Sequence, residues 1–337
     1  MEVRAVITGT GSYAPGIAID NAELMKLAGV EFDGPRLEEK IGIGKRHIAR
    51  LRGIDETTVD FAEKASIRAM EAAGIAPADI GLFIVATDTP EYVSPASGIL
   101  LQGRLQKGER EAEAIDISSS CASFVAALDL AARKLTTDYS IRHALVAGVY
   151  NMPAHIRDGD AFGWSIFADG AGAVVLSREE GPGASRYVDG VFRVDGTQWD
   201  FVGVYAGGTR KPLTRELLDS GRYGLELLQK LPGDRNVKLW PPLVLRLLEK
   251  AGWKQDRVAH FIFTQINLSV IREVMEILGE PMTKTTTVMD HFGYTGSGCL
   301  PMALDEALRS GRVKKGDAVV LVASGAGLSV GANLIVL

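Results

Sequence analysis

Short apolar runs of strand length alternate along this chain with longer segments of helical periodicity, and glycine-rich turns separate the two. One helix is marked at both ends, because Thr57 or Thr58 precedes VDFAEKASIRAMEAAG and Gly74 closes it. Strands that alternate with helices in this way are typical of an α/β protein. The expected buried strands of the first half are residues 3–9, 81–87, 114–117 and 143–149.

The second half repeats this order and ends in a glycine-linked pair of strands. ADGAGAVVL (168–176) is weakly echoed by ASGAGLSVGANLIVL (323–337), which indicates a duplicated architecture. We therefore expect an N-terminal half at 1–177 and a C-terminal half at 178–337. Residues 184–235 look irregular and are expected to form a cap or a pocket wall.

Composition excludes several classes of protein. The 337 residues carry a net charge of −5 and no long Lys/Arg run, so a nucleic-acid partner is not expected. Two cysteines do not make a disulfide framework, which favours a reducing compartment. The start has no long apolar core of a signal peptide, and no apolar stretch has the length of a membrane span. These features predict a cytoplasmic protein without a membrane partner.

Cys121 is the sharpest candidate for chemistry. It follows a short strand and three serines, and it is expected to open a long apolar helix. Free N–H groups and the helix dipole at such a position favour a thiolate, which is the nucleophile that accepts an acyl group from a thioester. On these residues alone, a buried cysteine that only fills space is an equal alternative.

Several blocks together resemble the ketoacyl-ACP synthase III family of the thiolase superfamily. They are ATDTPEYVSPAS, DISSSCASFVAALDLA, FADGAGAVVL, DHFGYTGSGCLPMALDEAL and ASGAGLSVGANLIVL, in the family's order and spacing. The resemblance implies a thiolase-like five-layer αβαβα sandwich of two duplicated halves. It also implies an acyl-Cys121 intermediate and a pantetheine tunnel. The backbone N–H groups of Cys121 and Ala326 would form the oxyanion hole.

The chain departs from the family at two catalytic positions. The family's His-Gln-Ala-Asn block reads Thr264-Gln265-Ile266-Asn267, so Thr264 stands at the histidine position. The family's asparagine position is Tyr294. Both hydroxyls can donate hydrogen bonds, but neither has the near-neutral pKa of histidine. Thr264 and Tyr294 remain candidate site-lining residues, and His291 is a speculative substitute for the missing histidine.

Further residues are candidates for binding the pantetheine or the substrate. Asn267 could contact the pantetheine or could only cap a helix. Lys40, Lys45 and Arg46 could hold CoA phosphates or could lie in a solvated loop. Ser94 stands where relatives carry a bulky residue that lines the partner subunit's pocket, so a roomier acyl pocket is expected.

Three functions are compatible with these sequence features. The favoured one is an acyl transferase that charges Cys121 from acyl-CoA or acyl-ACP and passes the acyl group to a small acceptor. The second is a 3-oxoacyl-ACP synthase III-like enzyme that forms C–C bonds with a rebuilt site. The third is a degenerate, non-catalytic subunit of a heterodimer, whereas the first two favour a homodimer. No metal-ligand spacing or dinucleotide motif is present, so no cofactor beyond the thioester substrate is expected.

Overall fold

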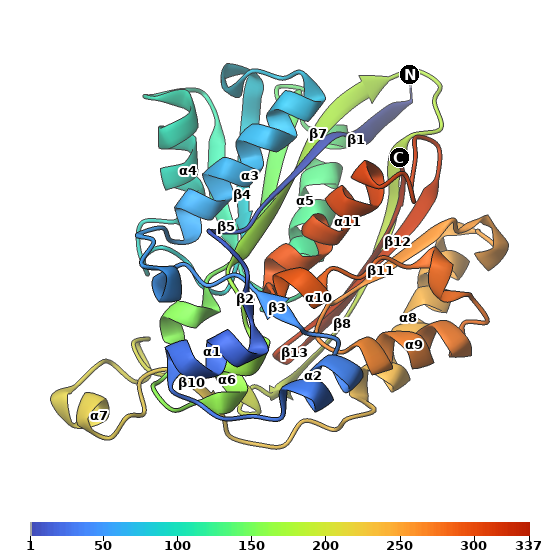
Figure 1. The fold of residues 1–337 in the computed structure, drawn as a ribbon. Helices are drawn as coiled ribbons and strands as arrows, with labels where there is room; N and C mark the ends of the chain where they lie inside the picture. The colour runs from blue at the N-terminus through green and yellow to red at the C-terminus, as the bar shows by residue number, and fades with distance from the viewer. Residues whose placement is uncertain (1) are drawn as a thin grey trace.

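The computed structural model describes residues 2–337 and shows two sheets with helices between them and outside them (Figure 1). The first sheet takes its strands from the N-terminal half, in the order β1-β7-β6-β4-β5. The pairs β1·β7 and β7·β6 are antiparallel, whereas β6·β4 and β4·β5 are parallel. The strands are β1 (Val3–Tyr13), β4 (Ile80–Ala86), β5 (Glu113–Ile117), β6 (His143–Tyr150) and β7 (Gly170–Glu180).

The second sheet takes its strands from the C-terminal half, in the order β11-β12-β13-β8. Taken from β8, its pairs are antiparallel, antiparallel and parallel, which repeats the first three pairs of the first sheet. The two segments with similar sequences lie in β7 and β13. Each of these strands is second from an edge of its sheet, β7 next to β1 and β13 next to β8. The predicted duplication is therefore confirmed. The strands are β8 (Arg186–Gln198), β11 (His260–Phe263), β12 (Ala318–Gly325) and β13 (Gly327–Val336).

The helices complete five layers. Two helices cover the outer face of the first sheet, two lie between the sheets, and two cover the second sheet (Figure 1). This is the αβαβα sandwich that the resemblance implies. In that order the pairs are α3 (Thr58–Ala73) with α4 (Ser97–Gln106), α5 (Ser123–Thr137) with α11 (Cys299–Arg309), and α8 (Arg235–Ala251) with α9 (Leu268–Ile277).

Local sequence explains why α3 begins and ends where it does. Thr57 is the N-cap, and Asp60 completes a capping box by accepting from the Thr57 N–H at 2.9 Å. Gly74 ends the helix with φ of 65°, a conformation that glycine adopts without steric cost. Both ends agree with the sequence prediction.

Two expectations need correction. The long helix does not open at Cys121, because α5 begins at Ser123 with Ala122 as its N-cap. Residues 186–198 are not irregular but form β8, an edge strand whose exposed and glycine-containing sequence lacks clear alternation. The expected division at 177/178 lies in the last residues of β7, and the chain passes from the first sheet to the second between β7 and β8.

Most of the shorter elements lie toward the lower end of the sandwich in Figure 1. None of the helices formed by residues 2–337 is long and apolar enough to cross a membrane. The short helices are α1 (Asn21–Ala28), α2 (Gly34–Lys40), α6 (Ala161–Ile166), α7 (Arg215–Asp219) and α10 (Met289–Phe292). The short strands are β2 (Ile19–Asp20), β3 (Lys45–Arg46), β9 (Val202–Val204) and β10 (Leu225–Leu227).

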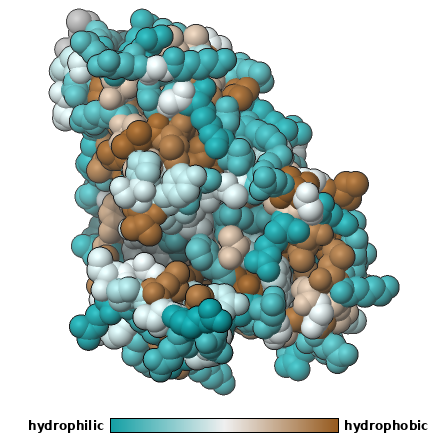
Figure 2. Space-filling model, turned by 90° about the vertical axis from the view of Figure 1, so that its left-hand side faces the viewer, coloured by the Kyte–Doolittle hydropathy of each residue, from teal (hydrophilic) through white to brown (hydrophobic). Residues whose placement is uncertain are grey.

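Hydrophobic side chains are also present on the surface. Figure 2 views the side on which α4 and α7 lie in Figure 1, and it shows hydrophobic patches among hydrophilic residues around a hollow. In the loop before α4, Tyr92 is 57% exposed and Val93 is 93% exposed.

Candidate active site

Cys121 lies in a tight turn between the end of β5 and the start of α5. Ser120 has φ of 52°, a left-handed conformation that costs energy for a residue with a side chain. The Ser123 hydroxyl holds the turn, because it accepts from the Ser119 N–H at 2.8 Å and donates to the Ser120 carbonyl at 2.5 Å. The turn places Cys121 beside the N-terminus of α5 and in the wall of a cavity.

The cavity has a volume of about 540 Å³ and is mainly apolar. Its walls come from both halves of the chain and include β9, Leu225 of β10, residues 231–233 and Arg235. Residues 184–235 were predicted to form a cap or a pocket wall, and parts of this segment do line the cavity. Apolar and aromatic side chains from the first half face this segment: Tyr150, Met152, Phe162, Ile166 and Phe167.

The turn between β12 and β13 packs directly against the cysteine turn. A Cβ built on Gly325 would lie 2.6 Å from the Ser119 carbonyl oxygen and 2.8 Å from the Cys121 nitrogen. Only glycine permits this approach. Ala326 follows and lines the same cavity as Cys121, which is the arrangement that the predicted oxyanion hole requires.

Two tyrosines face Cys121. Tyr294 is buried and lines the cavity, and its hydroxyl makes a hydrogen bond with Cys121 that lowers the pKa of the thiol. Tyr150, at the end of β6, lines the same cavity, and its burial, followed by the nearby Cys121, raises the pKa of its hydroxyl. The backbone of Tyr294 is fixed to the first half, since its N–H donates to the Ile166 carbonyl at 3.1 Å.

Burial has a larger effect on the pKa of Cys121 than the Tyr294 hydroxyl does. Desolvation, followed by the negative charge of Asp88, raises the pKa of the Cys121 thiol to about 12. Cys121 and Asp88 lie deep in the protein, and the surface that they retain faces the cavity. The thiol is therefore protonated at neutral pH.

Of the two substituted family positions, only Tyr294 lines the cavity. Thr264 is buried behind it, where its hydroxyl accepts from the Ser324 N–H at 3.1 Å and supports the β12–β13 turn. His291 does not reach the cavity either. Its ring contacts the Asp290 carboxylate at 2.8 Å and packs against Phe292. The side chains of Thr264 and His291 therefore do not line the cavity.

Asn267 lines the cavity and also caps α9, where its side-chain oxygen accepts from the Val270 N–H at 3.2 Å. Both interpretations of Asn267 are therefore compatible with the structure. The backbone of Lys40 lies beside the cavity, because its neighbour Ile41 lines the wall and its carbonyl accepts from Ser269 at 2.6 Å. Its side chain is exposed.

The other predicted binding residues lie outside the cavity lining. Lys45 is exposed on β3, and Ser94 is exposed in the loop before α4. The prediction that Arg46 binds CoA phosphates at the surface is wrong, because its side chain is completely buried. Its guanidinium donates inward to the Ser165 carbonyl at 2.9 Å, and burial lowers its pKa to about 10.

Asp88, which no sequence motif marked as a site residue, lines the cavity two residues beyond β4. Its Oδ2 accepts from the Ser120 hydroxyl at 3.0 Å. A signal was available, because polar residues that follow neighbouring parallel strands meet at one edge of a sheet. Residues 81–87 and 114–117 were both expected as strands, but their adjacency was not known. Tyr150 was missed for the same reason.

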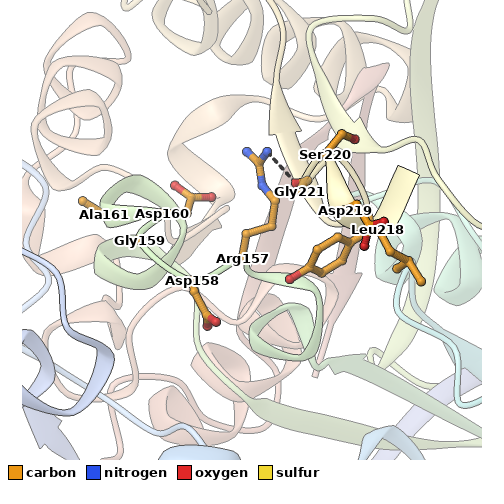
Figure 3. A pocket seen from close by; sticks show the side chains of 10 residues that line it. Arg157, Asp158, Gly159, Asp160, Ala161, Leu218, Asp219, Ser220 and Gly221 are labelled. Atoms are coloured by element: carbon orange, nitrogen blue, oxygen red, sulfur yellow. Dashed lines mark hydrogen bonds between the residues drawn. The ribbon is translucent and has the colours of Figure 1, made fainter. Parts of the chain in front are cut away.

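A second cavity lies between the segment before α6 and the segment around α7 (Figure 3). Arg157 lies between these segments and donates to the Gly221 carbonyl at 3.1 Å. Gly224 packs against the backbone of His155, where a Cβ would lie 2.2 Å from the carbonyl oxygen. These contacts hold residues 221–224 against the first half of the chain. Among the described residues, no cysteine lines this second cavity.

Comparisons with known proteins identify the family. The family model 3-oxoacyl-[acyl-carrier-protein (ACP)] synthase III matches residues 115–196, and the model of its C-terminal part matches residues 248–337. Beta-ketoacyl-[acyl-carrier-protein] synthase III of Coxiella burnetii is 32% identical over 98% of both chains. The Sphingopyxis alaskensis protein of the same name is 33% identical over 99% of both.

Solved structures show the same fold. The 3-oxoacyl-[acyl-carrier-protein] synthase III of Aquifex aeolicus superposes with a TM-score of 0.84 at 28% identity, over 99% of this chain and all of the other. The priming β-ketosynthase of the R1128 polyketide pathway superposes with a TM-score of 0.86 at 29% identity, over 99% of this chain and 96% of the other. With its duplicated sheets and with Cys121 at the meeting point of the two halves, the chain belongs to the ketoacyl-ACP synthase III family of the thiolase superfamily.

Proposed function

We propose that this protein is an acyltransferase that carries its acyl group on Cys121 and transfers it to a small acceptor with its own O–H, N–H or S–H nucleophile. The observation that carries the proposal is the composition of the cavity. Cys121 faces the β12–β13 turn and two tyrosine hydroxyls, and none of the five histidines lines the cavity. An acyl-enzyme needs only a thiolate and an oxyanion hole, and both could form here.

The first half-reaction is attack of Cys121 on the donor thioester. The developing oxyanion would be held by the N–H groups of Cys121 and Ala326, and the donor thiolate would leave. Relatives are named for a substrate bound to acyl carrier protein, which supports a pantetheine thioester as the donor. The thioester would then be the only coenzyme required.

The second half-reaction distinguishes this function from condensation. Decarboxylation of a malonyl unit creates an enolate that needs strong, well-placed donors in the transition state. Thr264 lies behind the cavity wall with its hydroxyl already engaged, and His291 lies outside it. A neutral tyrosine at position 294 gives weaker support to an enolate than a charged or imidazole donor.

Condensation remains the second candidate, because the 32–33% identical relatives are named beta-ketoacyl-ACP synthase III. In that function Tyr294 and Tyr150 would together stabilise the enolate. A degenerate subunit is the least favoured reading, since such a chain has no need to keep an open cavity at its cysteine.

Intact-protein mass spectrometry with a panel of acyl-CoA and acyl-ACP donors tests the proposal. We expect the native protein to gain one acyl group, Cys121→Ala to gain none, and the matched control Cys299→Ala to gain one. Release of the acyl group by alcohols or amines, without carbon dioxide from malonyl thioesters, would support transfer. Carbon dioxide release with a new C–C bond would replace the proposal by condensation. Failure of every donor would leave the degenerate-subunit interpretation.

A further inference from the structure

Among residues 2–337, Asp88 is the one carboxylate that lines the Cys121 cavity. It follows β4, and the cysteine turn follows β5, so the two parallel neighbours bring them together. The Asp88 Oδ2 accepts from the Ser120 hydroxyl at 3.0 Å, and the Asp88 Oδ1 is buried without a hydrogen-bond partner. A buried carboxylate oxygen without a partner is costly, and such groups persist where they serve a purpose.

Ser120 connects Asp88 to the nucleophile. Its hydroxyl oxygen lies 3.8 Å from Cys121 Sγ, within hydrogen-bond reach of a sulfur atom. Serine has one hydroxyl hydrogen, and the carboxylate is the stronger acceptor for it. The Ser120 oxygen is then free to accept the Cys121 thiol hydrogen.

From this geometry we propose that Asp88 is the proton acceptor of the active site and works on Cys121 through the Ser120 hydroxyl. The inference deepens the proposed function and rests on Cys121 as the acyl-carrying nucleophile. Thr264 stands at the family's histidine position and has no imidazole. Asp88 would therefore accept the proton at this site.

The proton balance closes in both half-reactions. The Cys121 proton passes to Ser120 as the serine proton passes to Asp88, and the thiolate attacks the thioester. The expelled donor thiolate then takes the proton from Asp88. In the second step Asp88 accepts the proton of the incoming acceptor, the new bond forms, and the Cys121 thiolate leaves. Asp88 returns the proton to that thiolate through Ser120.

The electrostatic surroundings suit this role. Burial raises the pKa of Asp88 to about 6, and the Ser120 hydrogen bond opposes the rise. A base that is ionised at neutral pH, with a pKa close to it, is efficient in proton transfer. The titratable groups that face Cys121 and Asp88 are Tyr150, Tyr294 and Cys299. Arg235 also lines the cavity, but the main influences on the pKa of Asp88 and Cys121 include no lysine, arginine or histidine of residues 2–337.

The rate of Cys121 alkylation by iodoacetamide between pH 5 and 10 tests the inference without any acyl donor. Mass spectrometry of the Cys121 peptide separates this cysteine from Cys299. For the native protein we expect a rise near pH 6, a plateau, and a second rise where the thiol ionises unaided. Asp88→Asn should lose the first rise and react on the order of 10²-fold more slowly at pH 7.

The same variant should react as fast as the native protein or faster at pH 10. The reason is that the negative charge of Asp88 raises the pKa of Cys121, so its removal lowers that pKa. Ser120→Ala should be slow at pH 7 without any gain at pH 10, because Asp88 keeps its charge. Since Ser120 has a positive φ, Ser120→Gly serves as a second variant that avoids strain. The surface variant Asp158→Asn is the control.

Loss of the same factor at every pH would show a structural role for Asp88 and overturn the inference. An unchanged profile in Asp88→Asn would overturn it as well. Failure of all donors to acylate the native protein would instead sink the proposed function, while the alkylation profile would still decide the role of Asp88.

Discussion

Asp88→Asn should stabilise the fold at alkaline pH while it impairs the active site. Asparagine has nearly the same shape as a protonated aspartic acid, but it carries no charge that burial can penalise. The pKa of Asp88 rises from 3.8 to about 6 on folding. Because the folded-state pKa lies above the unfolded one, the stability contributed by this carboxyl is complete below pH 3.8 and is lost as the pH rises to about 6.

The magnitude follows from these two pKa values. The native carboxylate costs about 3 kcal/mol at pH 8 and about 0.5 kcal/mol at pH 4, as upper estimates because the cavity is partly accessible. Asp88→Asn should therefore exceed the native protein in unfolding free energy by up to about 3 kcal/mol at pH 8. The two proteins should nearly coincide at pH 4.

Urea denaturation at fixed protein concentration, at pH 4 and pH 8, measures this difference. Asp158→Asn, which removes a surface carboxylate, is the control and should show no comparable gain. A stability difference that does not grow with pH would refute the reasoning, because it would show that the Asp88 carboxylate is not desolvated. The combination of a stabler fold with a slower cysteine is typical of residues kept for function.

Three further substitutions test the rest of the site, and a fourth, in α4, serves as a control. Tyr294→Phe removes the hydrogen bond that lowers the pKa of Cys121 but keeps the ring, so acylation should slow about tenfold with little change in the urea midpoint. Gly325→Ala places a Cβ 2.6 Å from the Ser119 carbonyl oxygen and should destabilise the fold by about 1–3 kcal/mol and slow acylation. Gly103→Ala in α4 meets open space and should instead stabilise by about 0.5–1 kcal/mol, and equal effects would contradict the packing argument. Asn267→Ala removes the N-cap of α9 and should cost about 1 kcal/mol in the unfolding free energy, with a raised KM if the side chain also contacts pantetheine.

Local signals predicted the elements whose ends are set by their own residues. The capping box of α3 and the glycine after it were readable, because a cap bonds to residues three or four positions away. The edge strand β8 was not readable, because its side chains are partly exposed on both faces and its sequence shows no period. The start of α5 was misplaced by two residues, since the serine turn before it continues the small-residue pattern.

The sequence by itself determined the class of fold and the duplication, and it singled out Cys121 as the candidate nucleophile. Periodicity, glycine turns and the position of Cys121 between a strand and an apolar helix are properties of neighbouring residues in the chain. The tertiary structure alone decided which side chains surround that cysteine. Asp88 meets it because β4 and β5 are parallel neighbours, and Tyr294 meets it because its backbone pairs with the segment at Phe167. Thr264 and Arg46 point elsewhere because strand adjacency and core packing set their directions, and no local pattern records either.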